Sequence, residues 1–193
     1  TQFVVVPERI LLTTPQPSVF VRAAADFVIE VSARGSIGER ALPNYQPSNM
    51  QIALNRLAPL GENTVNGNFT YAQSTSIAPS ATPSTIFSSS VITASGSGIT
   101  NTNGVYSFIA NYSEFGQLSL DLRDTDYFNQ TITSGPSGAS EPAVLGVFIP
   151  AYYTVTPNTP KLSNTCEVST GFTYLGQPQG FEQDVELSVS AMN

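Results

Sequence analysis

Apolar and polar residues alternate with a period of two over much of this 193-residue chain. Residues 27–33 and 116–123 show the alternation, and both stretches contain β-branched or other bulky apolar residues. No window of about a dozen residues keeps the i, i+3, i+4, i+7 apolar spacing of an amphipathic helix. The pattern therefore predicts an all-β chain.

The predicted strands are short and numerous. They cover residues 3–6, 9–13, 27–33, 50–57, 67–73, 88–94, 104–112, 116–123, 144–148, 152–156, 172–175 and 185–191. Residues 74–90 are rich in Ser, Thr, Ala and Pro and are expected to form a long surface loop. Such connections are too long for simple hairpins and suit Greek-key crossings, so we expect two packed antiparallel sheets rather than a barrel.

Two stretches of the chain resemble each other, residues 26–33 and residues 184–191. Each follows an aromatic and aliphatic run that is broken by proline and closed by threonine, over residues 3–13 and 147–156. The repeat predicts one complete module over residues 1–142, then a connector and the opening strands of a second module over 143–193. Tandem modules of this kind are typical of stalks, spacers and adhesive surfaces.

Charge is sparse, with 7 basic and 14 acidic residues and a net charge of −7. The basic residues form no cluster, which argues against nucleic acid or an anionic membrane surface as a partner. No apolar run approaches the about 20 residues that cross a bilayer, so we expect no membrane insertion. Thr1 opens no signal peptide, and the segment is expected to have lost its targeting sequence or to begin downstream of it.

The residues needed for common catalytic sites are missing. The absence of histidine excludes Ser-His-Asp and Cys-His catalysis and the usual zinc sites. Lys161, the only lysine, is expected to be solvated, and the lone Cys166 is either a buried thiol or half of a bond to a partner outside the segment. Paired carboxylates remain, but Glu30, Asp121 and Glu186 alternate with apolar neighbours and are expected on solvated faces. The chain is therefore predicted not to be an enzyme.

Asp121, Asp124 and Asp126 form the candidate metal site. Carboxylates two and three positions apart at the end of a strand and in the following turn can converge on a calcium ion, with Glu114 one strand over. The alternative is a turn in which the aspartate side chains accept hydrogen bonds from backbone amides. Because the glycine-punctuated spacing of an EF-hand is absent, the turn is the favoured interpretation.

Eight tyrosines supply rings that can stack on sugars or fill a sandwich core, and core positions are favoured. The run from Tyr112 to Gly116 resembles a tyrosine corner, in which the hydroxyl ties a strand to a turn. Tyr152 and Tyr153 are adjacent, so they point to opposite faces of a strand. One of them is expected to be exposed or packed at a module junction, which makes the pair candidate ligand contacts.

Several motifs, in order, resemble those of the MshQ-like proteins, large exported proteins associated with the mannose-sensitive haemagglutinin type IV pilus of Gram-negative bacteria. The resemblance covers about residue 3 to residue 193. The motifs are residues 24–33, 42–45, 110–116, 124–127 and 147–150, Cys166, and the Phe-Thr-Tyr-Leu-Gly-Gln-Pro run at 172–178. The family's common Phe-Ile-Pro-Asp start of the second module has Ala151 in place of the acid here, so no charge contact is expected at that point.

The resemblance implies an immunoglobulin-like sandwich located outside the cell or at the cell surface, with a role in adhesion or pilus assembly. Its implied partners are neighbouring immunoglobulin-like modules, pilus components, and host or surface glycans. Our first hypothesis is a non-catalytic structural or adhesive segment. One alternative is a carbohydrate-binding module, calcium-assisted through the three aspartates. The other is a filament subunit that assembles by strand exchange: if strand 185–191 lacks a sheet of its own, it must pair with the first module or with a neighbouring molecule.

Overall fold

The computed structural model describes residues 4–13, 20–36, 40–61, 64–72, 75–80, 86–88, 91–163, 175–176 and 180–193. The chain divides into two compact units: one runs to Pro150 and includes Asn193, and the other comprises Ala151–Met192. Each unit is described by itself below. Within the described residues the regular structure is β-strand, apart from the single-turn helix η1 (Pro136–Gly138), so the predicted all-β class is confirmed.

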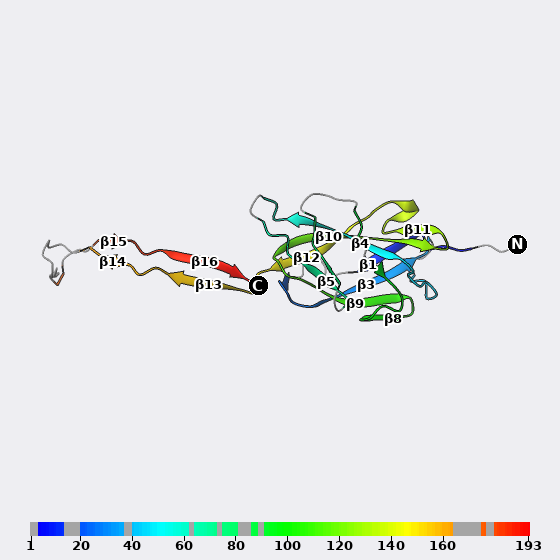
Figure 1. Ribbon diagram of the computed structural model, residues 1–193, viewed down its shortest axis with the longest axis horizontal. Coiled ribbons are helices and arrows are strands. Elements are labelled where there is room, and N and C mark those ends of the chain that lie inside the picture. The colour runs from blue at the N-terminus through cyan, green and yellow to red at the C-terminus, as the bar shows by residue number, and fades with distance from the viewer. Residues whose placement is uncertain are drawn as a thin grey trace. The chain divides into compact units, whose positions relative to one another are not determined.

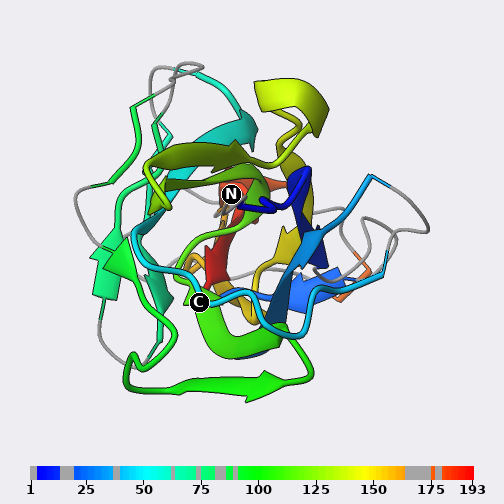
Figure 2. The same cartoon turned by 90° about the vertical axis from the view of Figure 1, so that its right-hand side faces the viewer.

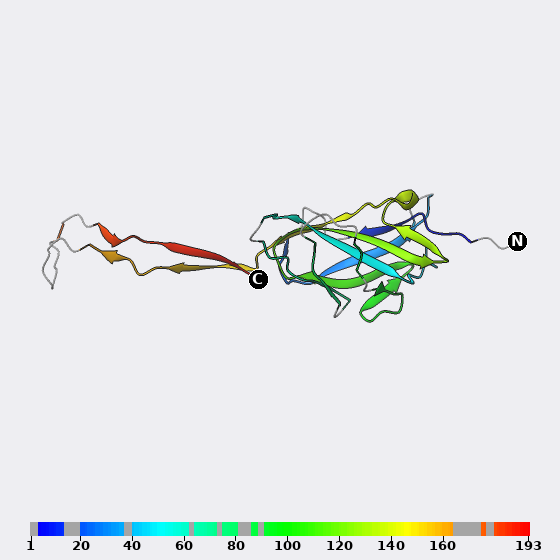
Figure 3. The ribbon, with the colours of Figure 1, turned by 45° about the horizontal axis from the view of Figure 1, so that its top comes forward.

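Among its described residues, the first unit forms two six-stranded sheets. Figures 1 to 3 show this unit from three directions. The first sheet has the order β1 (Arg9–Thr13), β3 (Phe27–Arg34), β9 (Val105–Tyr112), β5 (Phe69–Tyr71) and β6 (Thr75–Ile77), and β8 (Ile99–Thr102) also pairs with β9. The second has the order β2 (Phe20–Arg22), β12 (Ala143–Ile149), β10 (Gly116–Tyr127), β4 (Met50–Ala58) and β7 (Val91–Ile92), and β11 (Gln130–Thr133) also pairs with β10.

This strand order is that of an immunoglobulin-like sandwich. The sequence β1-β3-β9-β5 corresponds to strands A, B, E and D, and β12-β10-β4 corresponds to G, F and C. The first strand is split, because β1 pairs antiparallel with β3 in one sheet while β2 pairs parallel with β12 in the other. The predicted immunoglobulin-like sandwich is therefore confirmed for the first unit.

The core lies between the sheets and follows the period-two pattern. Leu118, Leu120 and Leu122 of β10 are at most 1% exposed, and they share one cluster with Ile29 and Val31 of β3. Phe148 of β12 packs its ring against aromatic rings of other strands, with centroid distances of 5.4 Å to Phe27 and 5.1 Å to Tyr112. Such pairs add directional contacts to the apolar area that the core removes from water.

The first unit extends further than residue 142. Strand β12 pairs with both β10 and β2, and its Leu145 and Phe148 are 0% and 2% exposed. It occupies the position of strand G, so the sandwich needs it to cover its core. The structural division consequently falls after Pro150 rather than at the predicted 142.

Most predicted strands match observed ones, with exceptions at both ends. Residues 4–6 form no strand, and their valines are 40% to 72% exposed. Short strands that the alternation did not predict are β2, β6, β8, β11, β14 (Lys161–Leu162) and β15 (Phe181–Gln183). Cys166 and most of the predicted strand 172–175 lie outside the described residues.

Among its described residues, the second unit forms two short two-stranded sheets. Strand β13 (Tyr152–Pro157) pairs antiparallel with β16 (Leu187–Met192), and β14 pairs with β15. Asn158 links the two arms, because its Nδ2 donates to the carbonyl of Asp184 at 2.7 Å and its Oδ1 accepts from the N–H of Glu186 at 3.0 Å. The last strand has a sheet of its own, because β16 pairs with β13, so the condition under which it would have to pair with the first module or a neighbouring molecule is not met.

Candidate functional site

Asp124 holds a loop onto strand β10. Its side chain is 0% exposed and faces the core, and Tyr45 donates a hydrogen bond to its Oδ2 at 2.8 Å. The N–H and hydroxyl of Ser48 and the N–H groups of Asn49 and Asp126 donate to the same carboxylate at 3.1 to 3.3 Å. Five donors thus surround the buried carboxylate, which compensates for its removal from water.

Tyr45 is itself part of this buried cluster. It is 1% exposed, its carbonyl accepts a hydrogen bond from the Tyr106 hydroxyl at 2.7 Å, and its ring lies 5.1 Å from that of Tyr127. Burial, together with the nearby charge of Asp124, raises the pKa of the Tyr45 hydroxyl well above its usual value. The phenol therefore stays neutral and serves as a hydrogen-bond donor.

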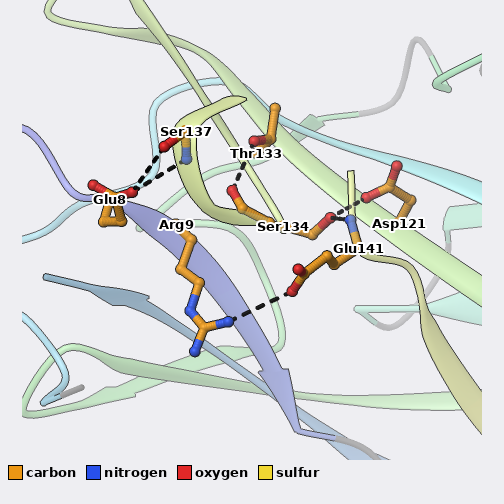
Figure 4. Close-up of polar contacts among 8 residues, drawn as sticks. Glu8, Arg9, Asp121, Thr133, Ser134, Ser137 and Glu141 are labelled. Atoms are coloured by element: carbon orange, nitrogen blue, oxygen red, sulfur yellow. Dashed lines mark hydrogen bonds and ion pairs between the residues drawn. The ribbon is translucent and has the colours of Figure 1, made fainter. Parts of the chain in front are cut away.

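Asp121 is buried on the opposite face of β10, beneath the loop that contains η1 (Figure 4). It is 7% exposed, so its expected place on a solvated face is wrong, whereas Glu30 and Glu186 are exposed as predicted. Ser134 donates its hydroxyl to Asp121 Oδ1 at 2.5 Å and accepts the N–H of Glu141 at 2.8 Å. The Ser140 hydroxyl donates to Oδ2. The aspartate therefore fastens the loop between β11 and β12.

The structure does not bring the three candidate metal ligands together. Strand β10 continues through Tyr127, so Asp121, Asp124 and Asp126 lie within a strand rather than in a turn after it. Asp121 and Asp124 are an odd number of residues apart in regular register with β4, which directs their side chains to opposite faces. Asp126 is exposed. Among the described residues no group of three or more His, Cys, Asp or Glu side chains is placed to hold a metal ion.

Asp126 instead contributes to an open cavity of about 400 Å³ at the β10–β11 turn. The cavity is lined by Asn44, Gln46, Ser48, Asp126, Tyr127 and Phe128. The turn is built from Phe128 and Asn129 with φ of 51° and 60°, as in a type I′ hairpin, where Asn and Gly are the usual residues. Phe128 is 63% exposed, so a bulky aromatic side chain occupies a left-handed position without being buried.

The hydroxyl of Tyr112 ties a strand end to another segment, as expected, but its partner lies 46 positions away rather than in the local corner. The side chain of Tyr112 is 0% exposed, and its hydroxyl donates to the carbonyl of Asn66 at 2.8 Å, which ties the end of β9 to the segment before β5. Arg56, which is 3% exposed, donates hydrogen bonds to the carbonyl of Val65, the residue before Asn66, and to the carbonyl of Phe115. The hydrogen bonds from Tyr112 to Asn66 and from Arg56 to Val65 fix residues 65–66 to the sandwich.

Tyr152 and Tyr153 are both exposed, at 55% and 63%, on strand β13. Cross-strand partners share a face, so one face of the β13–β16 pair carries only apolar side chains. These are Tyr153, Val155, Pro157, Leu187, Val189 and Ala191. On the other face Tyr152 pairs with Met192 at one end, and the hydroxyl residues Thr154, Thr156, Ser188 and Ser190 follow. Every described residue of the four strands of this unit is exposed, so the apolar face has no covering layer within the described residues.

Comparison with known proteins adds one partial similarity. Residues 114–193 match the family described as DUF6701, third domain. The match covers less than half of the chain, starting before β10 and running through β16. Searches of curated proteins and of solved structures found no match. Over this part the chain is thus similar to one domain of a multi-domain family.

Some features of these sites carried no sequence signal. The partners of Asp121 and Asp124 lie up to 79 positions away, in loops whose course the alternation does not define. The left-handed turn at Phe128 was equally hidden, because neither Phe128 nor Asn129 is glycine. Among the described residues, no helix has the length and apolar character to span a membrane.

Proposed function

We propose that this chain is a non-catalytic structural segment of an exported surface protein or type IV pilus-associated protein, and that it carries tension between neighbouring immunoglobulin-like modules. The resemblance to MshQ-like proteins supports the setting. The similarity to a third domain supports the presence of neighbouring modules. The observation that carries the mechanical part is the parallel pairing of β2 with β12.

Parallel pairing places β2 and β12, which lie near the two ends of the first unit's chain, in a shear geometry. Strand β2 is followed by every strand of the sandwich except β1, which precedes it, and β12 ends one residue before Pro150. When the chain is pulled toward its two ends, β2 and β12 are drawn past each other along their common axis. The evenly spaced hydrogen bonds of a parallel pair then share the load, in contrast to a hairpin that opens one bond at a time.

The test is to stretch single molecules of the full chain between its two ends. The N–H of Ala23 donates to the carbonyl of Ile149 at 2.7 Å, and period two directs the N–H of Val21 toward β12 as well. Val21→Pro removes that donor and should lower the rupture force of the first unit. Arg22→Pro, the matched control, removes an N–H that points away from β12 and should leave the force close to the unsubstituted value. Equal effects of the two prolines would contradict the proposal.

The cavity at the β10–β11 turn favours a second candidate function, recognition of a glycan. It combines an exposed aromatic ring, Phe128, with the amides of Asn44 and Gln46 and the carboxylate of Asp126. Aromatic faces pack on the C–H surfaces of sugars, and amide and carboxylate groups bond their hydroxyls. No calcium ion is needed for this arrangement.

A glycan array probed with the full chain tests this second function. Binding that is lost in Phe128→Ala and in Asn44→Ala, but kept in Phe115→Ala, would support it. Phe115 is 38% exposed and does not line the cavity, so it serves as the control. Binding that persists in Phe128→Ala, or the absence of any bound glycan, would count against it.

A further inference from the structure

The β13–β16 pair repeats the β1–β3 pair in its register. The sequence repeat places residues 184–191 on residues 26–33, and the proline and threonine of each preceding run place Pro150 on Pro7 and Thr156 on Thr13. With that correspondence, the observed pair Ile10↔Ala33 becomes Tyr153↔Ala191, and Leu12↔Val31 becomes Val155↔Val189. The two corresponding pairs, Tyr153↔Ala191 and Val155↔Val189, are both observed between β13 and β16. The sequence repeat and the strand pairing therefore agree position by position.

The corresponding faces have the same apolar character but opposite exposure. Ile10, Ile29, Val31 and Ala33 in the first unit are 0% to 1% exposed and belong to the core cluster. Their counterparts Tyr153, Leu187 and Val189 are 62% to 63% exposed. A face that the first unit buries completely is thus presented without cover in the second unit.

The first unit also shows what covers such a face. Leu118, Leu120 and Leu122 of β10, with residues of β4 and β12, form the other side of the core cluster. Strand β9 pairs with the edge of β3 that lies away from β1, with Ile29 opposite Phe108 and Val31 opposite Tyr106. All of these covering strands follow β3 in the chain.

We propose that β13 and β16 are strands A and B of a second immunoglobulin-like module, and that strands following β16 in the polypeptide cover their apolar face. The covering layer would be a leucine-lined antiparallel sheet equivalent to β4, β10 and β12, and an antiparallel strand equivalent to β9 would pair with the edge of β16. An intact first unit of another copy offers no such place, because both edges of its β3 are occupied, by β1 and β9. This inference is independent of the tension-bearing role.

A tandem chain tests the proposal: residues 1–192 followed by a second copy of residues 35–150, which supplies β4 to β12 but not β1, β2 or β3. Amide hydrogen exchange is measured on β13 and β16. If the hairpin replaces β1–β3, their amides should exchange at least about a hundredfold more slowly than in the 193-residue chain. Val189→Asp should remove that protection, whereas Ser190→Asp, one residue along on the hydroxyl face, should preserve it.

A second tandem chain keeps the test decisive. It appends residues 4–150, which bring their own β1 and β3, so this copy folds without the hairpin and β13 and β16 should remain unprotected. If this appended copy folds while the 35–150 copy does not, the hairpin does not act as strands A and B and the proposal fails. It also fails if Val189→Asp and Ser190→Asp have equal effects. A dimer of the 193-residue chain that Val189→Asp dissociates would instead assign the apolar face to a second copy.

Discussion

The hydroxyl of Tyr45 donates a 2.8 Å hydrogen bond to the carboxylate of Asp124, although 79 positions separate the two residues. Both side chains are buried, at 1% and 0% exposed. The contact joins the loop between β3 and β4 to the strand that lies at the centre of the second sheet. Because the carboxylate also accepts backbone N–H groups of Ser48 and Asn49, the loop is fixed by its main chain as well as by its side chains.

Tyr45→Phe should destabilise the first unit by about 1.5 to 3 kcal/mol, the range for a hydrogen bond to a charged group. The substitution keeps the ring and its packing and leaves the buried carboxylate with one donor fewer. Urea unfolding of the full chain, followed by fluorescence, measures the change. Tyr153→Phe is the control, since Tyr153 is 63% exposed and no effect is expected there. Equal stability of the two variants would contradict the assignment.

Stability should fall at alkaline pH. Burial raises the pKa of the Tyr45 hydroxyl, and burial also raises the pKa of Tyr106 and of Tyr112. The folded state therefore retains protons that the unfolded chain releases above its tyrosine pKa of about 10. The free energy of unfolding should be insensitive to tyrosine ionisation below that pH and decrease as pH rises above it.

The same measurement on Tyr45→Phe provides the control for this pH dependence. With one raised tyrosine pKa removed, the decrease in unfolding free energy per pH unit above pH of about 10 should be smaller than in the unsubstituted chain. Identical slopes would show that the Tyr45 hydroxyl ionises equally easily in the folded and unfolded states.

Gly116→Ala should be far more damaging than Gly138→Ala. Both glycines have positive φ, 129° and 79°, so both substitutions introduce backbone strain. A Cβ at Gly116 would lie 2.1 Å from the carbonyl oxygen of Ala58 on the neighbouring strand, whereas one at Gly138 would meet no atom within 4 Å. We expect about 1 kcal/mol for Gly138→Ala and at least about 3 kcal/mol for Gly116→Ala by thermal or urea unfolding. Similar values would mean that β4 and β10 separate easily at this point.

The long strands were predictable because both their faces are defined. In β3 and β9 every second residue enters the core, and the alternation gave their limits to within one residue. The short strands β2 and β11 have no such signal, because β2 is an edge strand of three residues and β11 has a single buried residue, Ile132. Strand β2 pairs with β12, which is distant in sequence. Strand β11 pairs with β10 through an unusual turn at Phe128 and Asn129.

The acidic residues show the same limit for the candidate site. Asp121 follows the alternation of a solvated face, yet it is buried because the loop with Ser134 and Ser140 covers that face. A loop that lies across a sheet leaves no periodic signal in the strand beneath it. Strand β10 also continues past Arg123, so the expected turn at Asp124 and Asp126 is a strand with side chains on two faces. The run from Tyr112 to Gly116 predicted that the hydroxyl ties down a strand end, but not its partner Asn66, which lies 46 positions away.

Asp121→Asn should cost about 1.5 to 3 kcal/mol, because an amide replaces one carboxylate oxygen and the hydroxyls of Ser134 and Ser140 lose an acceptor of full charge. Asp126→Asn, at an exposed position, should be near neutral. Thermal unfolding of both variants and of the unsubstituted chain, with calcium and with a chelator, gives the measurement. The opposite orientations of Asp121 and Asp124 lead us to expect the same midpoint with and without calcium. A calcium-dependent rise in the midpoint that Asp126→Asn abolishes would show that the carboxylates reorganise around an ion.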